Sequence, residues 1–487
     1  MGGAGRARLP ELWVPPFLFV VTFIVYYLST QPLMDDPDVP WHLATGRLIL
    51  EMGKIPDRDP FSFAADQTWY LLSWVWNLLL GVTEKAFGVF GVLMGVLAMT
   101  AGLVSLLAWH LIRMRLSLST VFFISMVAAL CMQDFITARP HLSGYVLAFV
   151  FYLICDRSRG KAGYGGLYAL PPLMLLWANT HGSFIAGFTV LAAFMAEAFA
   201  TKQFGWLKRL AMIAVVSFAL SLVNPYGLEV SIGALKTLAG TAKGHTVEWL
   251  PFAFTASTGI STWLVLFILS SNLRFAAVPL ADKLLAVAWL LACMLIMRNG
   301  PMFVLLSAPY VARCVEDATA DLREQRAPSR FIAFMERFSP AQLWAAAAAA
   351  AVAFSVGAAQ LPHDEKIISE SQSVADAIDY ATEHYPTHKY LADFNYGGQV
   401  IYRTFGALPF MMDSRAGTVY SEEAILDYIN FMYQTPGWQE GLHKYGVNAL
   451  LISKKLRFSQ AYENGEFHDS WQLVFAGKVA NVYIARP

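Results

Sequence analysis

The sequence predicts a polytopic α-helical membrane protein followed by a C-terminal soluble α/β domain. Of the 487 residues, 56% are hydrophobic and 14% are charged, which is about half the charged share of an ordinary soluble domain. The hydrophobic residues form nearly uninterrupted blocks, such as residues 17–28 and 90–109. A helix needs roughly 20 apolar residues to cross a membrane, and the chain supplies this length many times. This composition excludes a soluble enzyme and a disordered protein.

The charge balance and the cysteine spacing argue against a nucleic-acid-binding protein and against a zinc or CxxC site. The formal net charge is zero, whereas a nucleic-acid-binding protein normally shows a basic excess. The four cysteines lie in or beside apolar blocks and lack the CxxC and zinc spacings, so we expect buried apolar side chains. No small-residue cleavage site follows the first apolar block, so we predict an uncleaved first span.

The apolar blocks predict about eleven membrane spans. Lys and Arg concentrate in cytoplasmic connections, and alternate connections here hold 17 and 8 of these residues. This asymmetry predicts a cytoplasmic N-terminus and a C-terminal domain outside the cytoplasm. The predicted spans are approximately 12–29, 89–112, 119–133, 140–155, 166–179, 182–200, 207–223, 260–273, 282–297, 301–314 and 342–360.

Residues 70–84 are apolar enough to suggest a further span. Counting them as one would place Arg113 and Arg115 outside and spoil the alternation of the later loops. A segment of about 15 residues that ends in Glu84-Lys85 fits better as a helix lying at the outer membrane interface. The first external loop therefore runs from about residue 30 to residue 88.

We predict two domains. Residues 1–361 form the transmembrane domain, which includes the external loop 30–88 and a charged cytoplasmic linker at 315–341. Residues 362–487 have an ordinary globular composition and suffice for an independent extracytoplasmic α/β domain. In this domain we expect helices at 373–385 and 422–433, a turn at 395–398, and strands at 390–394, 447–452, 471–475 and 479–485.

Polar residues that could carry chemistry gather on the predicted external side. The first external loop carries Asp35, Asp36 and Asp38, followed by His42. The predicted cytoplasmic loops carry mostly Lys and Arg. This one-sidedness indicates a site at the external membrane surface. Its other candidate substrate-binding residues are Asp134, Arg139, His141, His181, Glu248 and Arg298.

The acidic cluster suits a general base. Three carboxylates within four residues repel one another, which raises the pKa of at least one of them and favours proton abstraction near neutral pH. The following residues predict a helix with Asp38 near its N-cap, His42 one turn later and Gly53 at its end. The structural alternative is that the aspartates only cap this helix and keep the loop solvated.

The arginines suit a phosphate group, which guanidinium binds by paired hydrogen bonds. Together, the base and the cations predict sugar transfer from a lipid-linked phosphate donor to an acceptor hydroxyl. Asp38 or Asp36 would deprotonate the acceptor while the cations hold the departing phosphate. The structural alternatives are snorkelling of Arg139 and Arg298 at the lipid headgroups and loop-joining hydrogen bonds at His181 and Glu248.

The stretch from Asp36 to Arg47, followed by Gly53-Lys54-Ile55-Pro56, resembles the first external loop of the GT-C superfamily of polytopic glycosyltransferases. That family places an essential acidic residue after the first span, then a juxtamembrane helix ending in glycine, then a second interfacial helix. The resemblance implies that Asp38, with Asp36 second, is the catalytic carboxylate. It also implies that residues 70–84 form the second helix.

The C-terminal part resembles the extracytoplasmic domain of large bacterial members at Asn395–Gly398, Asp413-Ser414-Arg415 and Trp438–Val447. The resemblance implies an inverting glycosyltransferase of the bacterial inner membrane, with a polyprenyl-phosphate sugar donor and a glycolipid, polysaccharide or protein acceptor. The chain lacks the tryptophan-aspartate pair typical of oligosaccharyltransferase tails, which argues against peptide N-glycosylation. Some relatives use a divalent metal, which the acidic cluster permits but does not require.

Two other functions are compatible with a polytopic protein. A flippase or transporter of lipid-linked saccharides should carry charge in mid-membrane, and the predicted span interiors carry almost none. A non-catalytic membrane assembly protein would tolerate neutralisation of both Asp36 and Asp38. The acidic first loop favours the transferase over both.

Overall fold

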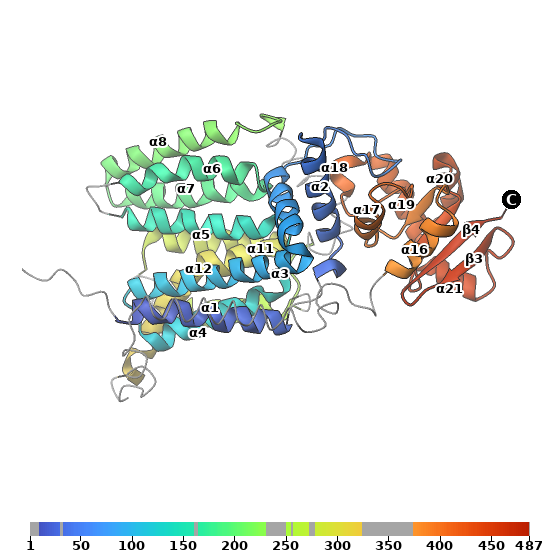
Figure 1. The fold of residues 1–487 in the computed structure, drawn as a ribbon. Coiled ribbons are helices and arrows are strands. Elements are labelled where there is room, and N and C mark those ends of the chain that lie inside the picture. Colours follow the sequence, from blue (N-terminus) through green and yellow to red (C-terminus); the bar gives the residue numbers. More distant parts are fainter. Residues whose placement is uncertain are drawn as a thin grey trace, which may run out of the picture.

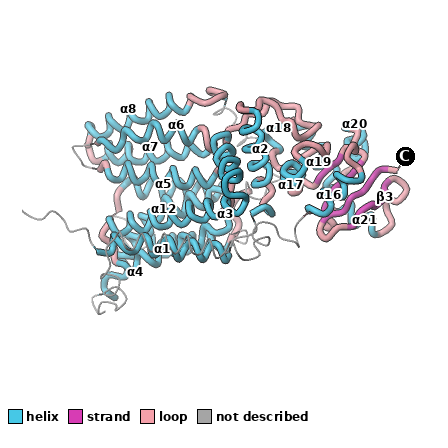
Figure 2. The backbone as a smooth tube through the Cα atoms, viewed as in Figure 1, coloured by secondary structure: helices cyan, strands magenta, loops and turns pink. Residues whose placement is uncertain are grey.

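The computed structural model describes residues 9–29, 33–159, 164–229, 250–254, 257–271, 278–323 and 374–486. Within these residues, long helices lie side by side in a bundle, and a smaller part with a β-sheet lies beyond one end of it (Figures 1 and 2). The bundle helices are α1 (Leu9–Ser29), α3 (Trp74–Arg113), α4 (Leu118–Met132), α5 (His141–Arg157), α6 (Leu170–Ala178), α7 (Ile185–Ala200), α8 (Phe204–Ser221), α10 (Thr258–Ser271), α11 (Leu280–Leu295) and α12 (Gly300–Arg323).

These helices coincide with ten of the eleven predicted spans, and the eleventh, residues 342–360, lies outside the described residues. Among the described helices, five are long and apolar enough to cross a membrane, so the total number of spans stays a prediction. Large apolar side chains such as Val215 and Phe218 on α8 are exposed, as expected of a surface that faces lipid tails.

Helix α12 corrects one predicted boundary. It continues to Arg323, so the first part of the predicted linker, residues 315–323, is helical. The Ala-, Asp- and Glu-containing sequence supports a helix, and Glu316 accepts hydrogen bonds from the backbone N–H and the hydroxyl of Ser117 at the start of α4. The remaining predicted linker residues lie outside the described part of the chain.

The far end of the bundle, away from the sheet, contains a partly buried ion cluster around Arg159. Arg159 follows α5, and its guanidinium pairs with Asp156 of α5, with Glu197 of α7 at 2.8 Å and with Asp282 of α11 at 2.8 Å. Because one guanidinium binds carboxylates from three helices, the cluster joins the ends of these helices.

The predicted interfacial helix 70–84 is the first part of α3. Helix α3 begins at Trp74 and is interrupted at Gly88, whose φ of 69° and ψ of −179° are not helical. A left-handed φ favours glycine because it lacks a Cβ. Before this kink, α3 crosses the end of the bundle beside α2 (Val39–Met52), and after it α3 runs with the bundle helices (Figure 1).

Two glycines let α2 and α3 cross in backbone contact. A Cβ at Gly46 would lie 2.2 Å from the carbonyl oxygen of Asn77, and one at Gly81 would lie 2.6 Å from the carbonyl carbon of Gly46. No side chain fits at either position without separating the helices. The close crossing places residues of α2 against residues of α3 at the end of the bundle.

The C-terminal part contains a four-stranded sheet in the order β1-β2-β4-β3. Strands β1 (Tyr390–Ala392) and β2 (Ala449–Ser453) are parallel, and β4 (Ala480–Ala485) is antiparallel to both β2 and β3 (Trp471–Ala476). The accompanying helices are α16 (Ala375–His384), α17 (Gly397–Thr404), α18 (Ala416–Val419), α19 (Glu422–Tyr433), α20 (Trp438–Tyr445) and α21 (Arg457–Glu463).

The predicted turn at 395–398 is only half correct. The backbone turns from Asp393 to Tyr396, but Gly397 and Gly398 already belong to α17. Paired glycines usually predict a turn. Here both glycines lie in a helix that packs too closely on neighbouring atoms to allow a side chain at either position. The other predicted strands and helices agree with the structure within a few residues.

The segment 33–73 and the C-terminal part share one hydrophobic core. Trp41, Phe61 and Trp69 pack in the same buried cluster as Tyr390 and Phe410, and Ser62 forms a backbone bridge with Phe410. Helix α2 consequently lies between α3 on one side and α17 on the other. The loop is therefore packed against both parts of the chain.

We expect Gly46→Ala to destabilise the protein by about 1–3 kcal/mol, because a methyl group at this crossing overpacks the α2–α3 contact. Thermal unfolding of the detergent-solubilised protein measures the effect. Gly102→Ala is the matched control, since a Cβ at Gly102 on α3 meets no atom within 4 Å. Equal melting temperatures for the two variants would contradict the role of the crossing.

Candidate active site

The N-terminus of α2 carries the two candidate catalytic aspartates. Asp38 is the N-cap residue, as predicted, but its side chain does not cap the helix. The Asp36 carboxylate does so instead, accepting the backbone N–H groups of Asp38 at 2.9 Å and Val39 at 3.2 Å. The helix ends at Gly53, which has a left-handed φ of 64°. This arrangement fixes Asp36 and leaves the Asp38 carboxylate available for other partners.

Arg139, between η2 (Gln133–Phe135) and α5, binds both aspartates. Its Nε lies 2.8 and 2.9 Å from the two carboxylate oxygens of Asp36, and its Nη1 lies 3.0 Å from Asp38 Oδ2. The arginine is only 8% exposed. Trp41 Nε1 donates to the other oxygen of Asp38 at 3.1 Å. One buried guanidinium thus compensates two carboxylates by charge-assisted hydrogen bonds.

The expected rise in carboxylate pKa does not occur at Asp38. Burial alone would raise the pKa of this carboxyl, but the charge of Arg139 opposes it most strongly. With His42 and hydrogen bonds from Ser414 and Trp41, Arg139 lowers the pKa of Asp38 from 3.8 to about 2. The sequence argument considered only the neighbouring acids and assigned Arg139 to phosphate binding, so it missed the pairing of Arg139 with Asp38.

His42 follows Asp38 by one helical turn and is buried. Its Nδ1 lies 2.7 Å from Oδ1 of Asn77, on the crossing helix α3. Burial lowers the pKa of His42 to about 4, although Asp38 and Asn77 act in the opposite direction. The imidazole is therefore neutral at neutral pH, and donation from Nδ1 to Asn77 leaves Nε2 as a hydrogen-bond acceptor.

Two further histidines lie at the same end of the bundle. The rings of His141, at the start of α5, and His181, before α7, are 6.5 Å apart between centroids. Nε2 of His141 lies 3.0 Å from the carbonyl oxygen of Phe135. Nδ1 of His181 accepts the backbone N–H of Ser183 at 3.2 Å, so neutral His181 carries its proton on Nε2 and can donate from there.

Electrostatic interactions connect these histidines to Arg298 and His42. Burial, followed by the charges of Arg298 and His42, lowers the pKa of His181 to about 3. Arg298 is half-buried in η8 (Met297–Asn299), between α11 and α12. The structure therefore gathers seven of the ten predicted site residues: Asp36, Asp38, His42, Arg139, His141, His181 and Arg298.

The other three predicted residues are less closely connected. Asp35 is half-buried at the end of η1 (Leu33–Asp35). Asp134 is exposed, and its carboxylate accepts a hydrogen bond from Ser257 at 3.1 Å, which links η2 to the start of α10. Glu248 lies outside the described residues.

The arrangement of the acidic residues bears on metal binding. In the part of the chain that the structure describes, no group of three or more His, Cys, Asp or Glu side chains could hold a metal ion. The guanidinium of Arg139 lies between Asp36 and Asp38, where a divalent cation would need to bind both carboxylates. In this arrangement, the two aspartates do not fit a metal ion.

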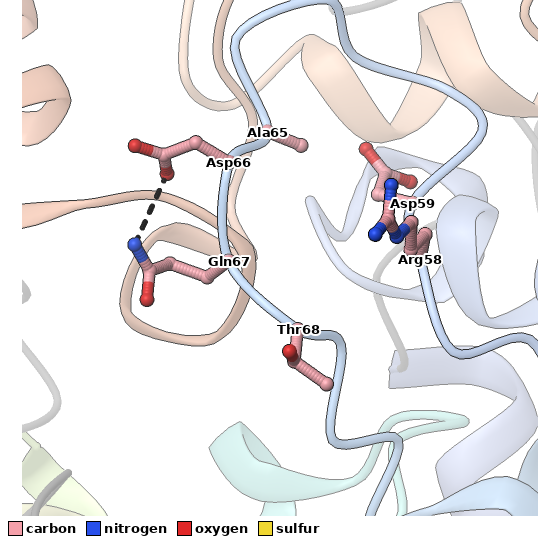
Figure 3. A pocket seen from close by; sticks show the side chains of 6 residues that line it. All are labelled: Arg58, Asp59, Ala65, Asp66, Gln67 and Thr68. Carbon is pink, nitrogen blue, oxygen red and sulfur yellow. Dashed lines mark hydrogen bonds between the residues drawn. The ribbon is translucent and has the colours of Figure 1, made fainter.

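The structure also contains a shallow pocket of about 290 Å³ farther along the first loop. Its lining includes Arg58, Asp59, Asp66, Gln67 and Thr68, and Figure 3 shows the hydrogen bond between Asp66 and Gln67. This pocket contains none of the carboxylates and imidazoles described above, and Asp59 is held in an ion pair with Arg415. We therefore place the candidate active site at the N-terminus of α2.

No protein-family model and no curated protein matches the sequence, but solved structures share the fold. The archaeal oligosaccharyltransferase AglB from Archaeoglobus fulgidus, in complex with an inhibitory peptide and a dolichol-phosphate, matches 91% of this chain and 70% of its own, with a TM-score of 0.61 and 12% identity. ArnT from Cupriavidus metallidurans bound to undecaprenyl phosphate matches over 96% and 97%, with a TM-score of 0.54 and 14% identity.

The arabinofuranosyltransferase AftD from Mycobacteria matches 97% of this chain and 40% of its own, with a TM-score of 0.51 and 13% identity. All three are GT-C glycosyltransferases. This chain has the GT-C fold. The expected GT-C fold is thus confirmed, and the candidate site lies at the end of the bundle beside the C-terminal part.

The sequence analysis missed two residues at the candidate site. Asn77 had no sequence signal, because its role depends on the glycine crossing of α2 and α3. Ser414 lies between Asp413 and Arg415, and its hydroxyl donates to the carbonyl oxygen of Pro37, next to Asp38, at 3.3 Å. This contact depends on the packing of the C-terminal part against the start of α2.

Replacing Arg139 by Gln should reverse the pH dependence of stability at this site. In the natural protein, the folded pKa of Asp38 is below 3.8, so its contribution of about 2 kcal/mol is present above pH 4 and lost toward pH 2. Without Arg139, burial raises the pKa of Asp38, so the variant should become more stable as the pH falls from 7 to 5. Melting temperatures in detergent across this range test the prediction, and parallel pH profiles would contradict it.

Proposed function

We propose that this protein is a membrane glycosyltransferase that moves a sugar from a polyprenyl-phosphate-linked donor to an acceptor hydroxyl. The main support is the Asp36–Arg139–Asp38 group at the end of the bundle, with His42, His181 and Arg298 nearby. This set combines a base with groups that bind phosphate. The fold agrees with it, since AglB was solved with a dolichol-phosphate and ArnT with undecaprenyl phosphate.

Asp38 is the better candidate for the general base. The Asp36 carboxylate is occupied by two backbone N–H groups and by Nε of Arg139. The Asp38 side chain is 19% exposed and has fewer partners. Asp38 would take the proton of the acceptor hydroxyl while the oxygen attacks the anomeric carbon. The bond to the phosphate oxygen breaks with its electron pair leaving on the phosphate, and attack from the opposite face inverts the configuration.

Arg139 would serve both the base and the donor. In the described structure its guanidinium keeps Asp38 ionised but weakly basic. A donor phosphate competes with the carboxylates for this guanidinium. When the guanidinium turns partly to the phosphate, its ion pair with Asp38 weakens, and the pKa of Asp38 rises. Substrate binding would in this way make Asp38 a stronger base when the donor is present.

Arg298 and His181 would stabilise the departing lipid phosphate. A guanidinium supplies charge and the Nε2–H of neutral His181 supplies a hydrogen bond. In this proposal the site faces the extracytoplasmic side, the N-terminus lies in the cytoplasm, and residues 362–487 form an extracytoplasmic domain. The acceptor is a glycolipid, polysaccharide or protein of the cell envelope.

We expect Asp38→Asn to lower transfer by a factor on the order of 10² to 10⁴, because the amide cannot accept the proton of the acceptor. Asp36→Asn should also lower transfer strongly, because it removes the ion pair that positions the guanidinium of Arg139. Incubation with a panel of polyprenyl-phosphate sugars, with mass spectrometry of the lipid and polymer fractions, measures the reaction.

The matched control is Asp379→Asn, which neutralises an aspartate paired with Arg403 on the surface of the C-terminal part. This variant should transfer at the natural rate. Full activity of Asp38→Asn in a panel where the natural protein is active would refute the catalytic role of Asp38. A natural protein that transfers no sugar from any donor in the panel would instead favour a flippase or an assembly protein.

We expect Arg298→Gln to weaken binding of the lipid phosphate product by about tenfold, since a charge-assisted hydrogen bond to phosphate is worth about 1.5–3 kcal/mol. Competition between polyprenyl phosphate and the donor in the transfer assay measures this affinity. Lys208→Gln, on α8 away from this site, is the control. Unchanged inhibition by polyprenyl phosphate would remove Arg298 from the proposed phosphate site.

A further inference from the structure

Asn77 is a fully buried polar residue on the part of α3 that crosses the end of the bundle. It is 0% exposed. Its Oδ1 lies 2.7 Å from Nδ1 of His42, and its Nδ2 is enclosed without a protein hydrogen-bond partner among the described residues. A buried amide donor without a partner costs free energy, which an apolar side chain of similar size would avoid. A polar residue at this position therefore calls for a reason beyond packing.

The glycine crossing fixes the contact between Asn77 and His42. Gly46 follows His42 by one helical turn, and a Cβ at Gly46 would lie 2.2 Å from the carbonyl oxygen of Asn77. The start of α3 is held from a second direction, because Nε1 of Trp74 donates to Oδ1 of Asn179 at 2.8 Å. With the two backbones in contact, the Asn77 amide has little freedom relative to the imidazole.

The imidazole of His42 lies beside the candidate general base. The ring centroids of Trp41 and His42 are 3.6 Å apart, and Nε1 of the same indole donates to Asp38 at 3.1 Å. His42 is only 4% exposed. Within the described residues its Nε2 has no hydrogen-bond partner, and unlike Nδ2 of Asn77 it is not enclosed. The uncovered edge of this buried ring therefore carries Nε2.

The contact with Asn77 decides what this nitrogen can do. A neutral imidazole has a single N–H. When Nδ1 of His42 donates to Oδ1 of Asn77, Nε2 keeps its lone pair and can only accept a hydrogen bond. A sugar hydroxyl is a suitable donor for such an atom, since each hydroxyl offers one O–H.

We propose that Asn77 is a positioning residue, which holds His42 in the tautomer whose Nε2 accepts a hydrogen bond from a substrate hydroxyl beside Asp38. This inference rests on the function proposed above and deepens it. The hydroxyl belongs to the transferred sugar or to the acceptor, and the kinetic test below distinguishes the two.

The first test measures the tautomer directly. Full-length protein labelled with ¹⁵N-histidine is studied by NMR in detergent at pH 7, and the His42 signals are identified by their loss in His42→Gln. We expect a protonated Nδ1 and an unprotonated Nε2 in the natural protein, and a changed balance in Asn77→Leu. A protonated Nε2 in the natural protein would overturn the inference.

The second test measures transfer by Asn77→Leu with the polyprenyl-phosphate sugar that the natural protein uses. Loss of one hydrogen bond should lower kcat/KM about tenfold for the substrate that carries the hydroxyl. A rise in KM for the donor alone assigns the hydroxyl to the sugar, and a rise for the acceptor alone assigns it to the acceptor. Asn481→Leu is the matched control, since Asn481 on β4 is also buried and has an unpartnered Oδ1. It should keep the natural kinetics.

The pH profile of Asn77→Asp separates positioning from a merely structural role. A carboxylate beside Nδ1 favours the protonated ring, so it raises the pKa of His42 from about 4. Because a protonated Nε2 cannot accept, this variant should lose activity relative to the natural protein as the pH falls from 8 to 6, and Asn77→Leu should not. The other charged or titratable groups that act on His42 are unchanged in both variants: Asp36, Asp38, Arg139 and His181.

Two kinetic results would also overturn the inference. One is natural kcat/KM in both Asn77 variants. The other is an equal loss in both with the natural pH profile, since Asn77 would then serve packing alone. If Asp38→Asn is inactive in the same assays, either result leaves the proposed function in place. If Asp38→Asn is active, the proposed function itself fails.

Discussion

The structure of the candidate site depends on one interaction, the pairing of Arg139 with Asp36 and Asp38. Two carboxylates beside a helix N-terminus would repel each other and draw in water, whereas a buried guanidinium within 3.0 Å of both makes them a compact polar unit. This pairing joins the first external loop to the start of α5. It also sets the protonation state of Asp38 and occupies the position where a phosphate is expected to bind.

Two further constraints hold this unit in place. The glycine crossing of α2 and α3 fixes α2 across the end of the bundle and brings Asn77 to His42. On the opposite side of α2, α17 and the Asp413–Arg415 segment press against Pro37. The acidic loop thus has neighbours from both parts of the chain, although it has little regular structure of its own before α2.

Much of this arrangement could be predicted from the sequence. The apolar blocks, the interfacial helix after residue 70 and the helix from Asp38 to Gly53 follow from periodicity and from glycine at a helix end. Successive connections between spans lie at alternate ends of the bundle. This alternation places Arg139 and the histidines at one end. The pKa of Asp38 did not follow, because it depends on which distant cation reaches the carboxylate. Asn77 and Ser414 were missed for the same reason, since their contacts join segments tens to hundreds of residues apart.

The buried pairing of Asp59 with Arg415 has a consequence for biogenesis. These partners are separated by 356 residues, so the ribosome makes nearly the whole bundle before the second partner exists. Until then, Asp59 lacks its counter-ion, and the aromatic rings of the first loop lack the hydrophobic neighbours that cover them in the mature fold. The buried contacts around Asp59 can therefore form only after the C-terminal part has been synthesised and packs against the first loop. A truncated nascent chain consequently remains incomplete at the site where the reaction is proposed to occur.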